Sequence, residues 1–424
     1  MKVKSTFTTT EKYAKNLDLE DPLAKFRSRF FIPKDTIYLD GNSLGLFPRD
    51  AEKCILRVMK EWKTLGIQGW FESERPWWYY GENLGAIAAP LVGAEPNEVV
   101  ATGTTTINLH SLVSTFYHPK GKKTKILADE LDFPTDIYAL KSQLKLKGLN
   151  PEEHLVLAPS NGRFFDEKKI VELMTEEIAL VMLPSALYRS GQLLDMAYLT
   201  KEAHTRDIPI GFDCCHSVGA VPHYFDDWGV DFAVWCSYKY LNSGPGGTAF
   251  LYINKKHFNK DPGLTGWFGY VKEKQFEMLL DFEHAKSAGG WQMSSSNILC
   301  SAPIEGALDV MLEAGIERIR EKSIKLTEYL IHLTDHLLAE SPYNFEVGTP
   351  RDPDRRTGHI ALEHDEAFRI SEALKARGVV TDYRPPNIVR VAPVALYNTY
   401  HEVWKIVQIL QEIIDNREYE NIFK

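Results

Sequence analysis

One lysine, Lys239, carries the most chemical information in this sequence. It lies in the segment 235–242, which reads WCSYKYLN, and a glycine-rich stretch follows at 243–247. Asp213 closes an earlier apolar run at 208–212. A lysine amine can form a Schiff base with pyridoxal phosphate, and a carboxylate can pair with the pyridinium nitrogen of that cofactor. Lys239 and Asp213 are therefore the minimum set for such a site; the alternative is an ordinary lysine on a loop.

Other polar residues have both a chemical and a structural interpretation. Asp213 and His216 lie three apart, a spacing that also suits a metal pair or a capped helix start, but no third metal ligand of suitable spacing is present. Thr105 and Thr106 can cap a helix, and a helix start is also where a phosphate binds. The planar guanidinium of Arg390 suits a substrate carboxylate, with an internal ion pair as the alternative.

Alternating strand and helix patterns must position these residues. Amphipathic helical patterns at 108–117, 136–146, 167–175 and 196–205 separate short apolar runs. Such alternation predicts an α/β protein with a mainly parallel, seven-stranded sheet that helices cover on both faces. The seven predicted strands are 98–102, 125–128, 154–158, 179–183, 208–212, 231–235 and 247–253.

The candidate residues follow the ends of the predicted strands. The threonines at 104–106 come after the first strand, the segment 133–136 after the second, and Asp213 and His216 after the fifth. In open α/β sheets, ligands bind beyond the carboxyl ends of the strands, where helix starts present unpaired N–H groups. The sequence therefore predicts that these distant segments meet in one crevice.

The chain is predicted to form a large and a small unit. The expected boundaries give an N-terminal segment, 1–60, that contributes to the small domain, a large domain at 61–302 and a C-terminal small α+β domain at 303–424. The segment 304–340 reads as a long helix interrupted near Gly315, and the polar, proline-broken stretch 350–356 reads as a mobile loop.

Composition indicates a protein that acts on a small molecule. The 424 residues carry a net charge of −9 with both signs interspersed, which argues against nucleic acid or anionic membrane as a partner. No stretch is apolar enough to span a membrane, and the start of the chain lacks the apolar core of a signal peptide, so a cytoplasmic location is expected. The five cysteines show no metal-binding spacing and are expected to be reduced.

Seven segments together resemble the kynureninase family. The resemblance runs in order from about residue 25 to residue 400. Single segments are shared with other pyridoxal phosphate enzymes of the same fold, whereas the whole set is specific. The segments are Leu39–Gly45, Thr106–His110, Phe133–Asp136, Asp213–Gly219, Trp235–Asn242, Gly266–Gly269 and Arg390–Asn398.

This resemblance implies a fold and an activity. The implied fold is that of the fold-type I, class V aminotransferase-like enzymes, which depend on pyridoxal phosphate, in a homodimer with active sites shared between subunits. The implied reaction is hydrolysis of the Cβ–Cγ bond of L-kynurenine to anthranilate and L-alanine, in tryptophan catabolism or NAD biosynthesis. A related substrate is 3-hydroxykynurenine, which gives 3-hydroxyanthranilate.

The resemblance also implies a role for particular residues. Lys239 matches the Schiff-base lysine that removes the Cα proton, and Tyr238 is expected to donate a proton to Cβ. Phe133 matches the ring that stacks on the cofactor. The other cofactor positions match Thr105, Thr106, Asp136, Asp213, His216, Trp267 and Ser295, and the expected substrate positions are Arg390, Trp70, Asn42 and Ser43.

Two departures from the family bear on the substrate. Trp70 stands where some members carry a histidine, and Ser295 where some carry an asparagine. Both changes remove a hydrogen-bonding group of the kind that would favour the 3-hydroxyl, so plain kynurenine is the expected substrate.

Other enzyme classes remain as alternatives at this stage. A cysteine desulfurase or an aminotransferase would share the lysine and the aspartate. A desulfurase also needs an exposed nucleophilic cysteine, whereas Cys236 and Cys300 are expected to be buried. No GxGxxG motif supports a nucleotide-dependent Rossmann enzyme, and the complete reactive set argues against a noncatalytic scaffold.

Overall fold

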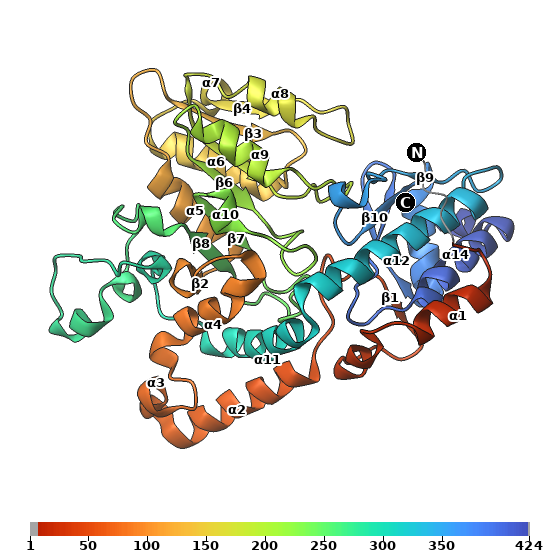
Figure 1. The fold of residues 1–424 in the computed structure, drawn as a ribbon, viewed down its shortest axis with the longest axis horizontal. Helices are drawn as coiled ribbons and strands as arrows, with labels where there is room; N and C mark the ends of the chain where they lie inside the picture. The colour runs from red at the N-terminus through yellow and green to blue at the C-terminus, as the bar shows by residue number, and fades with distance from the viewer. Residues whose placement is uncertain (1–6, 423–424) are drawn as a thin grey trace.

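A seven-stranded sheet forms the centre of the larger part of the molecule (Figure 1). The structure, a computed structural model, describes residues 7–422. The strand order is β2-β8-β7-β6-β5-β3-β4, and β8 runs opposite to the other six strands, which are parallel to one another. The predicted α/β fold class is confirmed. The strands are β2 (Val99–Ala101), β3 (Lys125–Asp129), β4 (Leu155–Ala158), β5 (Ile178–Pro184), β6 (Ile210–Asp213), β7 (Phe232–Trp235) and β8 (Phe250–Ile253).

Helices cover both faces of this sheet, as the apolar strand sequences predict. Every residue of β5 is buried, because its alternate side chains enter two different cores: Val181 and Leu183 belong to one, and Leu180 and Met182 to the other. The helices of this part are α3 (Gly69–Glu72), α4 (Tyr80–Ala88), α5 (Thr105–Phe116), α6 (Pro134–Leu146), α7 (Pro151–His154), α8 (Glu167–Glu172), α9 (Met196–His204) and α10 (Phe225–Trp228).

A second, smaller core lies in the C-terminal part, at the right of Figure 1. Its four-stranded antiparallel sheet has the order β12-β13-β10-β9. The predicted helical tract divides at Gly315, which has a positive φ of 80°. Helix α11 (Ile298–Ala314) still packs on the larger core. The elements after it are α12 (Ile316–Leu337), β9 (Glu346–Val347), β10 (Ile360–Glu363), α13 (Ala367–Ala376), β11 (Val379–Val380), β12 (Asp382–Arg384), β13 (Ile388–Val391) and α14 (Tyr400–Asp415).

The N-terminal segment contacts both parts of the molecule. Helix α1 (Glu11–Leu19) packs on α14, and β1 (Ile37–Tyr38) pairs in parallel with β11. Helix α2 (Arg49–Leu65) instead packs along α11. The proposed domain boundaries at residues 60 and 302 stay a prediction, and both positions lie inside helices, α2 and α11.

The structure differs from two local expectations, which concern Cys300 and the stretch 350–356. Cys300 is exposed, not buried, because it lies in the first turn of α11 beside an open apolar pocket; Cys236 is buried as expected. The stretch 350–356 is anchored by Arg356, which is fully buried and donates from Nε to Thr327 Oγ1 over 3.1 Å. Its neighbour Arg355 pairs with Glu167.

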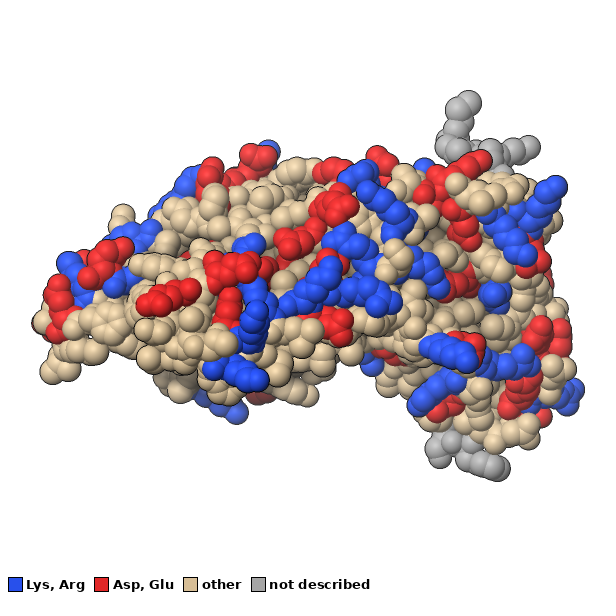
Figure 2. All heavy atoms as spheres, turned by 90° about the horizontal axis from the view of Figure 1, so that it is seen from below, with Lys and Arg blue, Asp and Glu red and all other residues tan. Residues whose placement is uncertain are grey.

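One face of the molecule shows both charge signs intermixed, and the described part of the chain has no membrane-spanning helix. On the face shown in Figure 2, Lys and Arg side chains are intermixed with Asp and Glu. Between residues 7 and 422, no helix is long and apolar enough to cross a membrane. The same residues contain no cluster of His, Cys, Asp and Glu suited to a metal. The residues 1–5, on which the signal-peptide expectation depends, lie outside the described range.

Candidate active site

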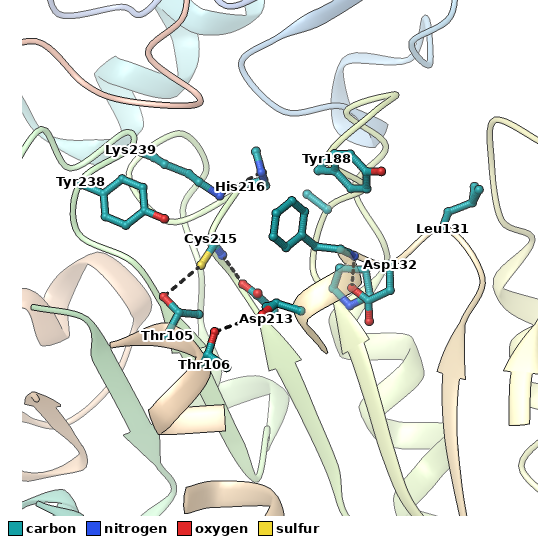
Figure 3. Close-up of a pocket in the computed structure, with 14 residues that line it drawn as sticks. Thr105, Thr106, Leu131, Asp132, Tyr188, Asp213, Cys215, His216, Tyr238 and Lys239 are labelled. Atoms are coloured by element: carbon teal, nitrogen blue, oxygen red, sulfur yellow. Dashed lines mark hydrogen bonds between the residues drawn. The ribbon is translucent and has the colours of Figure 1, made fainter. Parts of the chain in front are cut away.

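A pocket at the carboxyl ends of the central strands gathers most of the predicted cofactor residues (Figure 3). Asp213 ends β6, the threonines open α5, and Tyr238 and Lys239 come from the loop between β7 and β8. The strand-end argument therefore brings these segments together as predicted, although the roles of the residues stay predictions. The pocket-lining residues that were predicted are Thr105, Thr106, Phe133, Asp213, His216, Tyr238 and Lys239.

Lys239 lies beside a neutral imidazole. Its Nζ is 3.0 Å from His216 Nε2 (Figure 3). Burial, and then the positive charge of Lys239, lowers the pKa of His216 well below its usual value. The neutral ring accepts a hydrogen bond from the lysine amine, which fixes the amine inside the pocket.

The partly exposed Asp213 lies beside the fully buried Asp136. Asp213 Oδ1 accepts a hydrogen bond from the Cys215 amide over 2.7 Å. Asp136 is fully buried, and neither of its carboxylate oxygens has a donor. Burial and the charge of Asp213 raise the pKa of Asp136 well above its usual value, so Asp136 keeps a proton. The pair is suited to a protonated ring nitrogen.

The start of α5 is suited to a phosphate. The N-cap residue, Thr104, makes no side-chain hydrogen bond to the helix, so the first N–H groups have no side-chain cap. Thr105 and Thr106 both line the pocket, and Thr106 Oγ1 lies 3.3 Å from Thr135 Oγ1. An anion bound here would receive backbone and hydroxyl donors together.

Several pocket residues were missed by the sequence argument. Tyr188 follows the end of β5, and its ring meets Phe133 edge-on at 5.4 Å. Asp132 follows β3 and is buried. Both positions obey the strand-end rule, but the rule was applied after β3 only to residues 133–136 and was not applied after β5. The remaining missed residues are Leu131, Thr135, Pro184, Ala186 and Cys215.

The N-terminal turn at 40–45 packs against the lysine loop, the segment between β7 and β8 that carries Lys239. The Gly45 amide donates to the Tyr238 carbonyl over 2.8 Å. A Cβ atom at Gly45 would lie 2.4 Å from the Lys239 carbonyl oxygen, so only glycine permits this approach. Asn42, a predicted substrate residue, is fully buried nearby in sequence, and its amide atoms have no hydrogen-bond partner.

Arg390 is held in an internal ion pair next to the pocket. Its Nε donates to Asp382 Oδ1 over 2.7 Å, and its Nη1 donates to the Tyr188 carbonyl, also over 2.7 Å. Ser43 Oγ accepts from Arg390 Nη2 over 3.0 Å. The ion pair weighed as the alternative is therefore present, and the binding of a substrate carboxylate by Arg390 stays a prediction.

Three predicted residues lie together in a separate apolar pocket. Trp70, Trp267 and Ser295 line it with other aromatic side chains, and none of the three lines the Lys239 pocket. The ring of Trp70 meets those of Trp77 and Trp78 edge-on, each at 6.1 Å. Within one chain, the Lys239 pocket and these aromatic residues are two different sites.

The Lys239 pocket fits pyridoxal phosphate. Asp213 at the pocket wall, with the buried and unpartnered carboxyl of Asp136 beside it, and the uncapped start of α5 provide partners for the ring and the phosphate. Solved structures of similar fold include a cysteine desulfurase from Thermococcus onnurineus NA1, with a TM-score of 0.76 and 17% identity over 95% of this chain and 98% of that chain. A C-DES variant with glycine covalently linked to its PLP cofactor has a TM-score of 0.79, with 17% identity over 91% and 98%. Fold and site define a pyridoxal phosphate-dependent enzyme of fold type I.

Sequence relatives identify the family within this class. Residues 319–410 match the family model of the kynureninase C-terminal domain. A kynureninase from Bacillus anthracis is 54% identical, over 98% of this chain and 97% of the relative. A kynureninase from Geobacillus thermodenitrificans (strain NG80-2) is also 54% identical, over 97% and 96%. The chain belongs to the kynureninase family.

Proposed function

We propose that this protein hydrolyses the Cβ–Cγ bond of L-kynurenine to anthranilate and L-alanine, using pyridoxal phosphate. The observation that carries the proposal is the position of Lys239 Nζ, which lies in a strand-end pocket together with Asp213, His216 and Phe133. A cysteine desulfurase, the earlier alternative, is not favoured by the 54% identity to kynureninases, and the exposed Cys300 does not line the Lys239 pocket.

The residues would hold the cofactor and move protons around the substrate. When bound, pyridoxal phosphate withdraws electrons from the substrate Cα. Asp213 would keep the ring nitrogen protonated, the α5 threonines would hold the phosphate, and Phe133 would stack on the ring. The Lys239 amine would take the Cα proton, and the Tyr238 hydroxyl would give a proton to Cβ. Water adds to the Cγ ketone, so the cleaved products are a carboxylic acid and an amino acid.

We propose a homodimer in which each active site takes residues from both subunits. Trp267 and Ser295, which match cofactor positions, do not line the Lys239 pocket of their own chain. Apolar side chains are strongly exposed on α2 and on the segments that line the pocket of Trp267 or follow it, as expected for a face that another subunit covers. They include Leu56, Met59, Trp62, Ile67, Phe71, Phe276, Met278, Leu279 and Leu280.

We also propose a preference for plain kynurenine and a cytoplasmic location. The walls of the pocket around Trp70 are aromatic and aliphatic except for Ser294 and Ser295, so they offer little to bind a ring hydroxyl. The ratio of kcat/KM for kynurenine to that for 3-hydroxykynurenine tests this preference, and a ratio below one would contradict it. All five cysteines are free, as is usual in a reducing compartment.

The activity is tested by absorbance and fluorescence in one experiment. Purified protein should show the visible absorbance of bound pyridoxal phosphate and should release fluorescent anthranilate when L-kynurenine is added. Lys239→Ala should lose both signals, because no other pocket residue supplies an amine. Lys255→Ala, which changes an exposed lysine paired with Asp226, is the matched control and should keep both. Anthranilate release by the Lys239 variant at the unaltered rate would refute the proposal.

A further inference from the structure

Arg390 uses nearly all of its donors inside the protein. The side chain is 1% exposed, and it lies on β13 directly across from Asp382 on β12. A guanidinium carries five N–H groups. Nε and Nη2 donate to the two oxygens of Asp382, Nη2 also donates to Ser43 Oγ, and Nη1 donates to the Tyr188 carbonyl. One N–H, on Nη1, is left.

Asp382 holds one particular edge of the guanidinium. Since it takes Nε and Nη2, it occupies the side edge, and the end edge formed by Nη1 and Nη2 is directed to Tyr188 and Ser43. Tyr188 lines the Lys239 pocket. The end edge is therefore the one that a carboxylate in the pocket can meet with two parallel hydrogen bonds.

Asp382 also has a second cationic partner. Arg384 Nη2 lies 2.7 Å from Asp382 Oδ2, and Ser43 Oγ donates to the same oxygen over 2.9 Å. Burial alone would raise the pKa of Asp382, but its bonds to Arg390 hold the pKa below the usual value, so the group is ionised. Arg384 and Arg390 therefore both pair with this partly buried charge.

We propose that Asp382 is a positioning residue that aims Arg390 at the α-carboxylate of the substrate. The inference rests on the proposed function, because it takes an amino acid as the substrate. When the substrate binds, its carboxylate accepts hydrogen bonds from the end edge of Arg390. It replaces the Ser43 hydroxyl and the Tyr188 carbonyl, which accept from these N–H groups before it binds. Asp382 stays on the side edge and keeps the guanidinium plane fixed, so little freedom is lost when the carboxylate binds.

The test compares a substrate that has the carboxylate with an analogue that lacks it. In Asp382→Asn, the amide NH2 group replaces one of the two oxygens that accept hydrogen bonds from Arg390. The altered side chain can then no longer hold the plane of the Arg390 guanidinium through two hydrogen bonds. We expect KM for L-kynurenine to rise about tenfold or more, with kcat changed less than about threefold. The decarboxylated analogue kynuramine, which has no carboxylate, should inhibit with an unchanged Ki. A merely structural role would change both constants.

Asp335→Asn is the matched control. Asp335 also holds an arginine, Arg351, through two hydrogen bonds, but on the exposed surface of α12, so its loss should leave KM unchanged. If Asp382→Asn does not fold, as judged by circular dichroism, Asp382→Glu makes the same test, because the added methylene displaces the guanidinium. An unchanged or lower KM, or an equal rise in the kynuramine Ki, would overturn the proposal. Failure of the proposed function would instead be seen as no anthranilate from the unaltered protein.

Discussion

Burial sets the protonation of the groups around Lys239. His216 is neutral because its ring is buried beside a cation, and Asp136 keeps a proton because its carboxyl is buried beside Asp213. A neutral acceptor at His216 and a protonated carboxyl at Asp136 are then already in place before a ligand arrives. Such preorganised partners need little rearrangement when the cofactor ring and the substrate bind.

Tyr238→Phe tests the proposed proton donor. The change removes only the hydroxyl, so the visible absorbance of the bound cofactor should persist and KM should change little. Because general acid catalysis contributes about 10²- to 10⁴-fold, kcat for anthranilate release should fall by an amount in that range. Tyr224→Phe, at a surface tyrosine that donates to Glu317, is the control. A kcat within twofold of the unaltered enzyme would exclude Tyr238 as the donor.

The sequence predicted the pocket better than it predicted the surroundings of Arg390. Lys239, Asp213 and Thr105 follow strands that are easy to recognise, so the strand-end rule placed them together. Asp382 was missed because β12 has only three residues and each is polar or half-buried. A pairing across two antiparallel strands cannot be inferred when one strand is not predicted.

At the scale of elements, burial on both faces made the central strands predictable. Parallel strands such as β5 read as continuous apolar runs, because both of their faces contact a core. The edge strand β9, with two residues, gives no such pattern. The contact between the turn at 40–45 and the lysine loop was also beyond prediction, because it joins segments almost 200 residues apart.

Gly45→Ala tests whether this turn fixes the lysine loop. A methyl group would overlap the Lys239 carbonyl and the Asn242 backbone, and relieving such overlap costs about 1 to 3 kcal/mol. We expect pyridoxal phosphate to bind roughly tenfold to a hundredfold more weakly, as measured by absorbance titration of the apoprotein. Gly121→Ala, where a Cβ meets open space, should leave cofactor affinity unchanged. Equal affinities for the two variants would contradict the proposed contact.

Asp231 stabilises the opposite end of the sheet. Its Oδ2 accepts from the Ile210 amide and from His204 Nε2, each over 2.9 Å, and its Oδ1 from His257 Nε2 over 2.7 Å. Although burial alone would raise the pKa of Asp231, these bonds lower it far below the usual value. The resulting stability is present above the unfolded pKa of about 4 and is lost as the pH falls through the folded pKa.

Asp231→Asn should therefore destabilise the fold mainly at neutral pH. We expect the free energy of unfolding to fall by about 3 kcal/mol at pH 7, because one partner of a buried ionic cluster is lost. The difference from the unaltered protein should shrink below about pH 4. Urea unfolding at pH 7 and below about pH 4 measures this difference in the free energy of unfolding. The exposed Asp207→Asn is the control. A difference that is the same at both pH values would contradict an ionised Asp231.

At the scale of the whole molecule, the proposed dimer would build each active site from two halves that one chain carries at different places. The segment between β8 and α11 extends away from the sheet in Figure 1 and carries Trp267, while Lys239 lies at the strand ends. Leu280, on the same extension, is fully exposed. Strand patterns within one chain cannot predict how such halves combine, because in the proposed dimer the contacts that join them are between subunits.

Mixing two inactive variants tests the shared site. Lys239→Ala removes the amine from one half, and Trp267→Ala removes the aromatic wall from the other, so each variant alone should have little activity. In a mixed dimer, one site receives an intact Lys239 from one subunit and an intact Trp267 from its partner, whereas the other site lacks both. Random pairing makes half of the dimers mixed, so coexpression should restore about a quarter of normal anthranilate release if association is unbiased. If coexpression restores no more than the sum of the separate activities, Trp267 acts within its own chain and the shared-site model fails.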